Sequence, residues 1–154
     1  MKIDRTELRE AFIKAISARN LYKFSSTRLN TIVPHFFVCV TTKDNKVVLF
    51  TCCTSQFKKQ QLYIERRNDI PNSTLVWIKA PNKLNNLYKD TYVNCNDNFM
   101  YSFDELGKLY EAGKISLEGK ISEAEWQQII NGLLESPFTE DEIKELVQSL
   151  LDDY

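Results

Sequence analysis

The sequence predicts an α+β fold, in which a small, mostly antiparallel β-barrel carries an N-terminal helix and two or three C-terminal helices. Residues 35–55 contain two runs rich in β-branched and aromatic residues, joined by the polar stretch 42–46, which is the pattern of two paired strands. Both runs are nearly all apolar, so both faces of these strands should be buried. After Ser102 the chain turns acidic and takes on helical periodicity.

Length and composition favour one domain with its own core. The chain has 154 residues, of which 43% are hydrophobic. We expect a single domain over 1–154, with a helix in 1–20, the barrel in 30–100 and an acidic helical part in 102–154. No apolar run approaches the about 18 residues of a membrane span, and the N-terminus becomes charged at once. The sequence therefore predicts a cytoplasmic protein without a membrane partner.

The net charge of −1 conceals an asymmetry between the two ends of the chain. Residues 1–90 hold 16 Lys and Arg against 7 Asp and Glu, whereas residues 91–154 hold 4 against 14. This split predicts either a basic surface that attracts polyanions or two halves that attract each other.

The elements before and after the central hairpin follow from local patterns. Residues 4–20 predict a helix, because Asp4 can cap it with Glu7 three residues later. Residues 21–34 predict a loop with a short strand. Further strands are expected at 61–65, 74–79, 91–95 and 115–118. Capping boxes that begin at Ser102, Ser122 and Thr139 predict the C-terminal helices. The strand spacing of about ten residues is typical of a small barrel.

The cysteines give no metal pattern. The chain has four cysteines without a Cys-x-x-Cys motif and a single histidine, so we predict no metal site and no cofactor. Buried thiols in reduced form are the simplest interpretation. A catalytic Cys95 next to His35 is the alternative.

The hairpin itself carries the candidate site. The only histidine, His35, opens its first strand, and Thr54-Ser55 closes the second. A hairpin brings the start of one strand beside the end of the next, so these residues should be neighbours. The alternative is that His35 is a hydrogen-bonded strand end and Thr54-Ser55 a turn.

Residues Phe36 to Gln56 and Thr91 to Asp97 resemble the MazF/PemK (Kid) toxin family. Its members have a Src-homology-like small β-barrel and cut RNA without a metal. In that family an Arg-Pro dipeptide opens the first apolar strand, and the second ends in Thr-Thr or Thr-Ser. Here His35-Phe36 and Thr54-Ser55 stand at these positions. The resemblance covers roughly residues 30–100.

The resemblance implies an endoribonuclease site. His35 would act as acid or base, since histidine changes charge near neutral pH, and Thr54 and Ser55 would donate hydrogen bonds to the phosphate. Nearby cations would bind the RNA electrostatically. They are Lys58, Lys59, Arg66 and Arg67.

The chain also departs from the family. His35 replaces the catalytic arginine, the family's opening Gly-Asp strand and glycine-rich loop are missing, and the acidic tail after Gly119 is longer than usual. Two hypotheses follow. The first is a metal-independent endoribonuclease toxin, or a degenerate descendant, with single-stranded RNA as substrate, an antitoxin as partner and a homodimer as expected assembly. The second is a non-catalytic barrel module that binds a protein or RNA partner.

Overall fold

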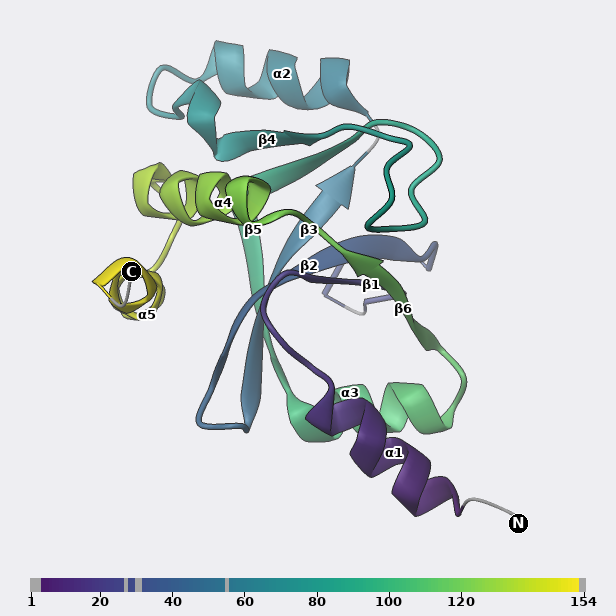
Figure 1. The fold of residues 1–154 in the computed structure, drawn as a ribbon. Coiled ribbons are helices and arrows are strands. Elements are labelled where there is room, and N and C mark those ends of the chain that lie inside the picture. The colour runs from purple at the N-terminus through teal and green to yellow at the C-terminus, as the bar shows by residue number, and fades with distance from the viewer. Residues whose placement is uncertain (1–3, 27, 30–31, 55, 153–154) are drawn as a thin grey trace.

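A six-stranded antiparallel sheet forms the centre of the molecule, with the strand order β4-β5-β3-β2-β1-β6 (Figure 1). The structure is a computed structural model that describes residues 4–26, 28–29, 32–54 and 56–152. The strands are β1 (Asn20–Phe24), β2 (His35–Lys43), β3 (Val47–Thr54), β4 (Leu75–Ile78), β5 (Thr91–Ser102) and β6 (Ile115–Lys120).

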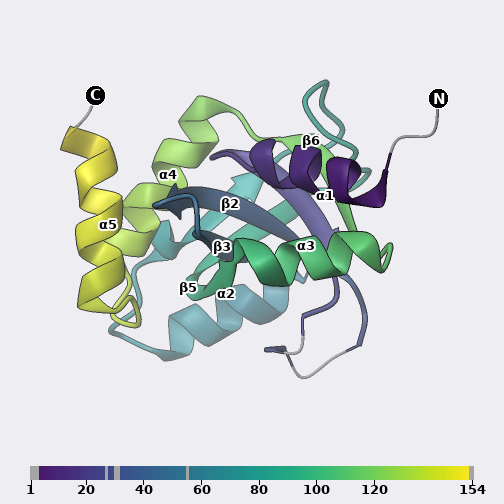
Figure 2. The ribbon, with the colours of Figure 1, turned by 90° about the horizontal axis from the view of Figure 1, so that it is seen from below.

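Helices cover both faces of the sheet. On one face α4 packs against the strands and α5 packs on α4; on the other, α1 and α3 lie together (Figures 1 and 2). The helices are α1 (Arg5–Lys14), α2 (Phe57–Arg66), α3 (Phe103–Glu111), α4 (Glu123–Glu135) and α5 (Asp141–Asp152), with a short 3-10 helix, η1, at Asn72–Thr74. An α+β fold with C-terminal helices is thus confirmed.

The central hairpin forms as predicted. Strands β2 and β3 pair from Phe37 opposite Cys52 to Lys43 opposite Val47. The turn between them places Asp44 and Asn45 at φ of 54° and 53°, which short polar side chains tolerate. Each face of the hairpin belongs to a different hydrophobic core, so residues on both faces are apolar and the runs are nearly continuous.

The sheet does not close, so the prediction of a barrel is wrong. Strands β4 and β6 are its two ends, and helices rather than strand closure bury its faces. The segment 84–86, beyond β4, reaches the outer edge of β6: Asn86 N–H donates to Glu118 O, and Lys120 N–H to Leu84 O, each at 3.0 Å. Gly119, at φ 108°, permits this contact, because a Cβ there would overlap the Leu84 carbonyl oxygen.

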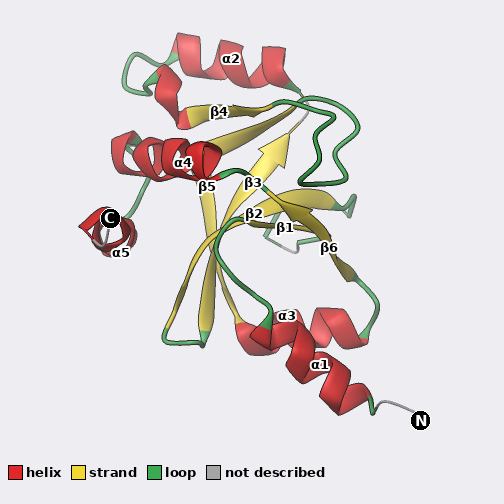
Figure 3. Cartoon of the chain, viewed as in Figure 1, coloured by secondary structure: helices red, strands yellow, loops and turns green. Residues whose placement is uncertain are grey.

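Residues 61–65 are helical, which overturns the strand predicted there (Figure 3). Helix α2 buries Ile64, and Phe57 stacks on Tyr92 of β5 with ring centroids 4.4 Å apart. Phe57 and Ile64 are seven residues apart, which is a helical spacing. The alternation of a five-residue stretch is too short to distinguish the two periods. Within residues 30–100 the sheet consequently has β2 to β5, and β1 and β6 come from outside that range.

Two of the three predicted C-terminal capping boxes form. Ser102 Oγ accepts the N–H of Glu105 at 3.0 Å, and Ser122 Oγ accepts that of Glu125 at 3.1 Å. The third does not form: α5 begins at Asp141, and the buried hydroxyl of Thr139 has no hydrogen-bond partner among the described residues. The N-terminal helix is capped by Asp4 as predicted.

That N-terminal helix is shorter than predicted, because α1 ends at Lys14 and β1 already begins at Asn20. Its packing comes from Phe12, which stacks on Tyr110 of α3 with centroids 4.5 Å apart.

The basic and acidic halves attract each other, which is one of the two readings of the charge split. Arg9 of α1 pairs with Asp104 at 2.7 Å and with Glu111 at 3.2 Å. Lys43 of β2 pairs with Glu142 of α5 at 3.4 Å. Arg9 is partly buried and its acidic partners are exposed, so solvent screens each pair and each contributes little stability by itself.

Candidate functional site

His35 and Thr54 line one cavity of about 630 Å³, as the hairpin geometry predicts. The pairing of β2 with β3 begins at Phe37 opposite Cys52, so His35 and Thr54 stand two residues beyond it on the two strands of the hairpin. Ser55, the third predicted residue of the site, lies outside the described residues.

Charged side chains from three other segments also line this cavity. Lys23 comes from β1, Lys89 from the loop between β4 and β5, and Asp97 from β5. A bulge places Asp97 there: β3 residues 51 and 52 pair with β5 residues 98 and 94, so residues 95–97 stand outside the ladder. The sequence pattern pointed to none of these three residues as part of the site.

Asp97 is the acidic side chain of the cavity. Its Oδ2 accepts a hydrogen bond from Asn94 Nδ2 at 3.3 Å. Although the residue as a whole is exposed, partial desolvation of the carboxyl raises its pKa above the ordinary value. A carboxylate with a raised pKa is a better proton acceptor than an ordinary one at neutral pH.

His35 is held by its own main chain. Nδ1 lies 2.8 Å from the carbonyl oxygen of Val33. Because a carbonyl only accepts, Nδ1 carries the donated proton, which leaves the lone pair of the neutral ring on Nε2. This arrangement suits proton transfer, although a hydrogen-bonded strand end would show the same contact.

Thr54 closes a local turn, because its Oγ1 accepts the N–H of Gln56 at 3.0 Å. The contact matches the turn that the sequence left open as an alternative. The hydroxyl proton of Thr54 remains a donor, so the residue can still hydrogen-bond to an anion in the cavity.

The thiols do not supply a nucleophile at neutral pH. Cys52 lines the cavity, but burial raises its pKa to about 12. Cys95 is fully buried, and its Sγ donates to the carbonyl of Ile129 on α4 at 3.6 Å. Cys95 does not line the cavity with His35, which removes the basis for a cysteine–histidine pair. All four cysteines are buried free thiols, as predicted.

The predicted RNA-binding cations lie on or just after α2, outside the walls of this cavity. Lys58 and Arg66 are exposed on the helix. Lys59 lines a neighbouring cavity of about 390 Å³. Arg67 binds Asp69 at 3.0 Å, and its guanidinium lies 4.7 Å from the ring centroid of Phe138 in the α4–α5 connection. Arg67 therefore has a structural role that the sequence did not predict.

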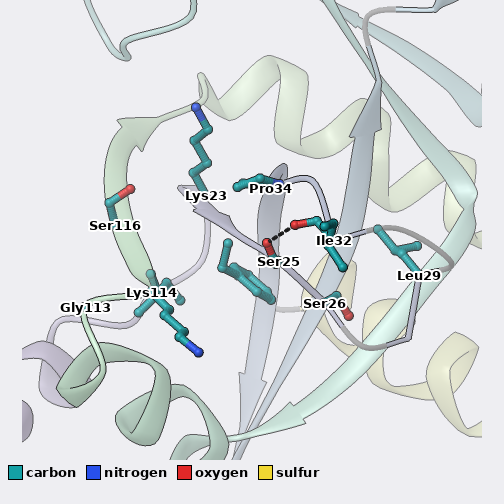
Figure 4. A pocket seen from close by; sticks show the side chains of 11 residues that line it. Lys23, Ser25, Ser26, Leu29, Ile32, Pro34, Gly113, Lys114 and Ser116 are labelled. Carbon is teal, nitrogen blue, oxygen red and sulfur yellow. Dashed lines mark hydrogen bonds between the residues drawn. The ribbon is translucent and has the colours of Figure 1, made fainter.

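Two neighbouring cavities share walls with the one that holds His35. The 390 Å³ cavity shares Gln60, Asn94 and Asp97 with it. A larger cavity of about 1120 Å³ shares Lys23, Leu29 and Pro34. Figure 4 shows this larger cavity, where Ser25 Oγ donates to the carbonyl of Ile32 at 2.8 Å.

Of the missed residues, Asp97 had a weak signal in the sequence. The polar run 96–98 interrupts the apolar alternation of β5, and such an interruption is typical of a bulge. Lys23 and Lys89 had none, because only the pairing of β1 with β2 and the path of the 79–90 loop bring them to the cavity.

No protein-family model matches this chain, and a search of curated proteins finds no match either. None of the described helices combines the length and apolar character that crossing a bilayer requires. The resemblance to the MazF/PemK family stays a prediction from residues 36–56 and 91–97 of the sequence.

Proposed function

We propose that this chain is a metal-independent endoribonuclease of the MazF/PemK type, which cleaves single-stranded RNA in the 630 Å³ cavity. One observation supports this proposal above the others. The cavity brings together two groups that can exchange protons, His35 and Asp97, and two cations, Lys23 and Lys89. The sequence offered only the histidine, and an acid–base reaction needs a second group.

The residues divide the chemistry as follows. The Asp97 carboxylate takes the proton of the ribose 2′-hydroxyl, whose oxygen attacks the adjacent phosphorus. Protonated His35 gives a proton to the departing 5′-oxygen, so that a 2′,3′-cyclic phosphate and a 5′-hydroxyl result. Lys23 and Lys89 stabilise the negative charge that grows on the phosphoryl oxygens. Thr54 donates a hydrogen bond to one of these oxygens.

The test is cleavage of a fluorescent single-stranded RNA by the purified chain with and without a chelator. His35→Ala and Asp97→Asn should each lower the rate by roughly 10²- to 10⁴-fold. Thr54→Ala should cost less, because it removes one donor and leaves both proton transfers. Lys46→Ala is the matched control, since Lys46 lies at the opposite, turn end of the same hairpin. Equal rates for wild type and His35→Ala would assign His35 a structural role.

The cations provide a second measurement. Binding of RNA through phosphate contacts weakens steeply as salt rises, because counterions are released. Charge reversal at Lys23 or Lys89 should weaken binding more than reversal at Lys58, Lys59 or Arg66, which lie outside the cavity. Reversal of Arg67 would also disturb its contact with Phe138, so it is a poor probe of RNA binding.

A non-catalytic module is the second candidate. It is favoured by the local bonds of the hairpin residues, since Thr54 Oγ1 and His35 Nδ1 both bond to nearby main chain. In this case the wild type would bind a partner in the cavity and leave RNA intact. Wild-type binding of RNA without cleavage products would support this candidate against the enzyme.

The resemblance also leads us to propose an antitoxin partner, a homodimer and a cytoplasmic location. Sedimentation at several concentrations measures the assembly. Expression in a bacterial host measures toxicity, and His35→Ala should relieve it if RNA cleavage is its cause.

A further inference from the structure

We propose that Tyr88 is a stacking platform for an unpaired nucleobase at the wall of the 630 Å³ cavity. The inference rests on the proposed function, in that the base belongs to the RNA strand whose phosphate enters the cavity. Tyr88 lies in the loop between β4 and β5 and lines the cavity together with His35 and Lys89.

The ring of Tyr88 is unusually accessible. Its exposed fraction is 77%, whereas most aromatic side chains of the chain belong to one of the two cores. No described aromatic ring stacks on it. Phe36, the other aromatic residue at the cavity, is half-buried and packs against the core. Tyr88 is therefore the aromatic residue of this cavity whose ring can accept a flat ligand.

The main chain on either side of Tyr88 is fixed. Leu87 is 4% exposed and belongs to the core. Asn86 N–H donates to the carbonyl of Glu118 on β6 at 3.0 Å, and Asp90 Oδ1 accepts the N–H of Ala80 at 2.8 Å. The exposure of Tyr88 is thus not a consequence of a loosely held loop. A platform held in place loses little conformational freedom when a ligand stacks on it.

The charges around the ring favour a nucleotide over a neutral ring. Lys89 Nζ lies 5.5 Å from the Tyr88 ring centroid, and Lys23 lines the same cavity. A nucleotide offers a planar base for the ring and a phosphate for the ammonium groups. Because every base has a π-face, stacking of this kind tolerates many sequences. The site therefore fits a base next to the scissile phosphate, with little preference among bases.

The experiment uses the full chain and a single-stranded 2′-O-methyl oligonucleotide that contains 2-aminopurine. The 2′-O-methyl groups prevent cleavage, and 2-aminopurine loses fluorescence when it stacks on a ring. Tyr88→Ala should weaken binding by roughly 5- to 100-fold, the usual effect of losing one base stack, and should abolish the quenching. Tyr88→Phe keeps the ring and should retain both.

Trp77→Ala is the matched control, because Trp77 is 50% exposed but does not line this cavity. Its binding and quenching should equal those of the wild type. Thermal unfolding of each variant verifies that the chain is folded.

The outcomes separate this inference from the proposed function. Suppose that the wild type cleaves RNA and that Tyr88→Ala binds and quenches the probe as the wild type does. This result would overturn the stacking platform and would still support the endoribonuclease. Tyr88-dependent binding without cleavage of ordinary RNA would support the platform and overturn the endoribonuclease. Absence of binding to any single strand would overturn both and favour a protein ligand.

Discussion

The indole N–H of Trp126 donates to the main-chain carbonyl of Val40 across 2.8 Å, which joins helix α4 to strand β2. Val40 stands at a bulge, because Cys39 and Thr41 pair with the consecutive residues 50 and 49 of β3. The bulge frees the Val40 carbonyl from the ladder, and the tryptophan satisfies it. The acidic C-terminal part is therefore bound into the core at a specific hydrogen bond.

Loss of this hydrogen bond should be measurable. Trp126→Phe keeps an aromatic ring but leaves the buried Val40 carbonyl without the indole donor, so we expect a loss of about 1–3 kcal/mol in the free energy of unfolding. Trp126→Ala adds a cavity and should cost roughly 3–5 kcal/mol. Urea unfolding measures both. Equal stability of Trp126→Phe and the wild type would indicate that the bond contributes nothing.

Removal of residues 121–154 should unfold or aggregate the chain. Ile129, Ile130 and Leu133 of α4 are fully buried against the sheet, so truncation would expose this face of the core. Thermal unfolding and size-exclusion chromatography measure the effect. A truncated chain that stays monodisperse and melts at the wild-type temperature would identify the tail as an independent unit.

Gly132 and Gly107 form a matched pair of helix positions. A Cβ at Gly132 of α4 would lie 2.7 Å from Cys95 Sγ and 2.9 Å from the main-chain oxygen of Ser73. Since the main-chain oxygen of Ser73 cannot move freely, Gly132→Ala should lower the free energy of unfolding by about 1–3 kcal/mol. At Gly107 of α3 the new Cβ meets the end of the flexible Arg9 side chain. Gly107→Ala should change stability by less than about 1 kcal/mol in the same unfolding assay.

Asp97 should make stability depend on pH in a predictable direction. Desolvation raises its pKa in the folded chain above the ordinary 3.8. The folded state thus holds this proton more tightly, so its contribution to stability is complete below pH 3.8 and is lost as the pH rises through the folded pKa. An asparagine carries no titrating carboxyl, so Asp97→Asn removes this loss. The free energy of unfolding of the variant should therefore rise relative to that of the wild type as the pH goes from acid to neutral. Unfolding free energies measured across this range test the sign; a relative loss would contradict it.

The buried thiols should resist alkylation. Burial raises the pKa of Cys39, Cys52 and Cys95 to about 12 each, so these thiols stay protonated at weakly alkaline pH. Folded protein treated with iodoacetamide at about pH 8 should remain unmodified, whereas the urea-unfolded chain should gain four labels by mass spectrometry. Rapid labelling of one cysteine in the folded chain would reveal a reactive site that burial does not explain.

Local signals predicted much of the fold. The hairpin 35–55 and the helices after Ser102 and Ser122 were recognisable because turn residues, β-branched runs and capping boxes act over a few neighbours. Helix α2 was mistaken for a strand, since its buried residues are too few to define a period. The sequence did not reveal that the sheet stays open, because this depends on which helices cover its two faces.

The candidate site was only half visible in the sequence. His35 and Thr54 stand at the open end of one hairpin, so their place at one cavity follows from local strand pairing. Lys23, Lys89 and Asp97 arrive from three separate segments, and only the strand order places them at the same cavity. A bulge sets the position of Asp97, and its location depends on pairing between β3 and β5 that no local pattern specifies.

The short segment 84–86 has a consequence for how molecules meet at high concentration. The outermost strand of a sheet offers unpaired N–H and C=O groups, on which a strand of another molecule can add. At β6 the main chain of Asn86 and Leu84 already occupies such positions, and the side chain of Asn85 bonds to the Lys120 carbonyl at 3.1 Å. An incoming strand would have to displace this segment first. The segment 84–86 therefore covers the edge strand near Gly119 and hinders edge-to-edge association with a strand of another molecule.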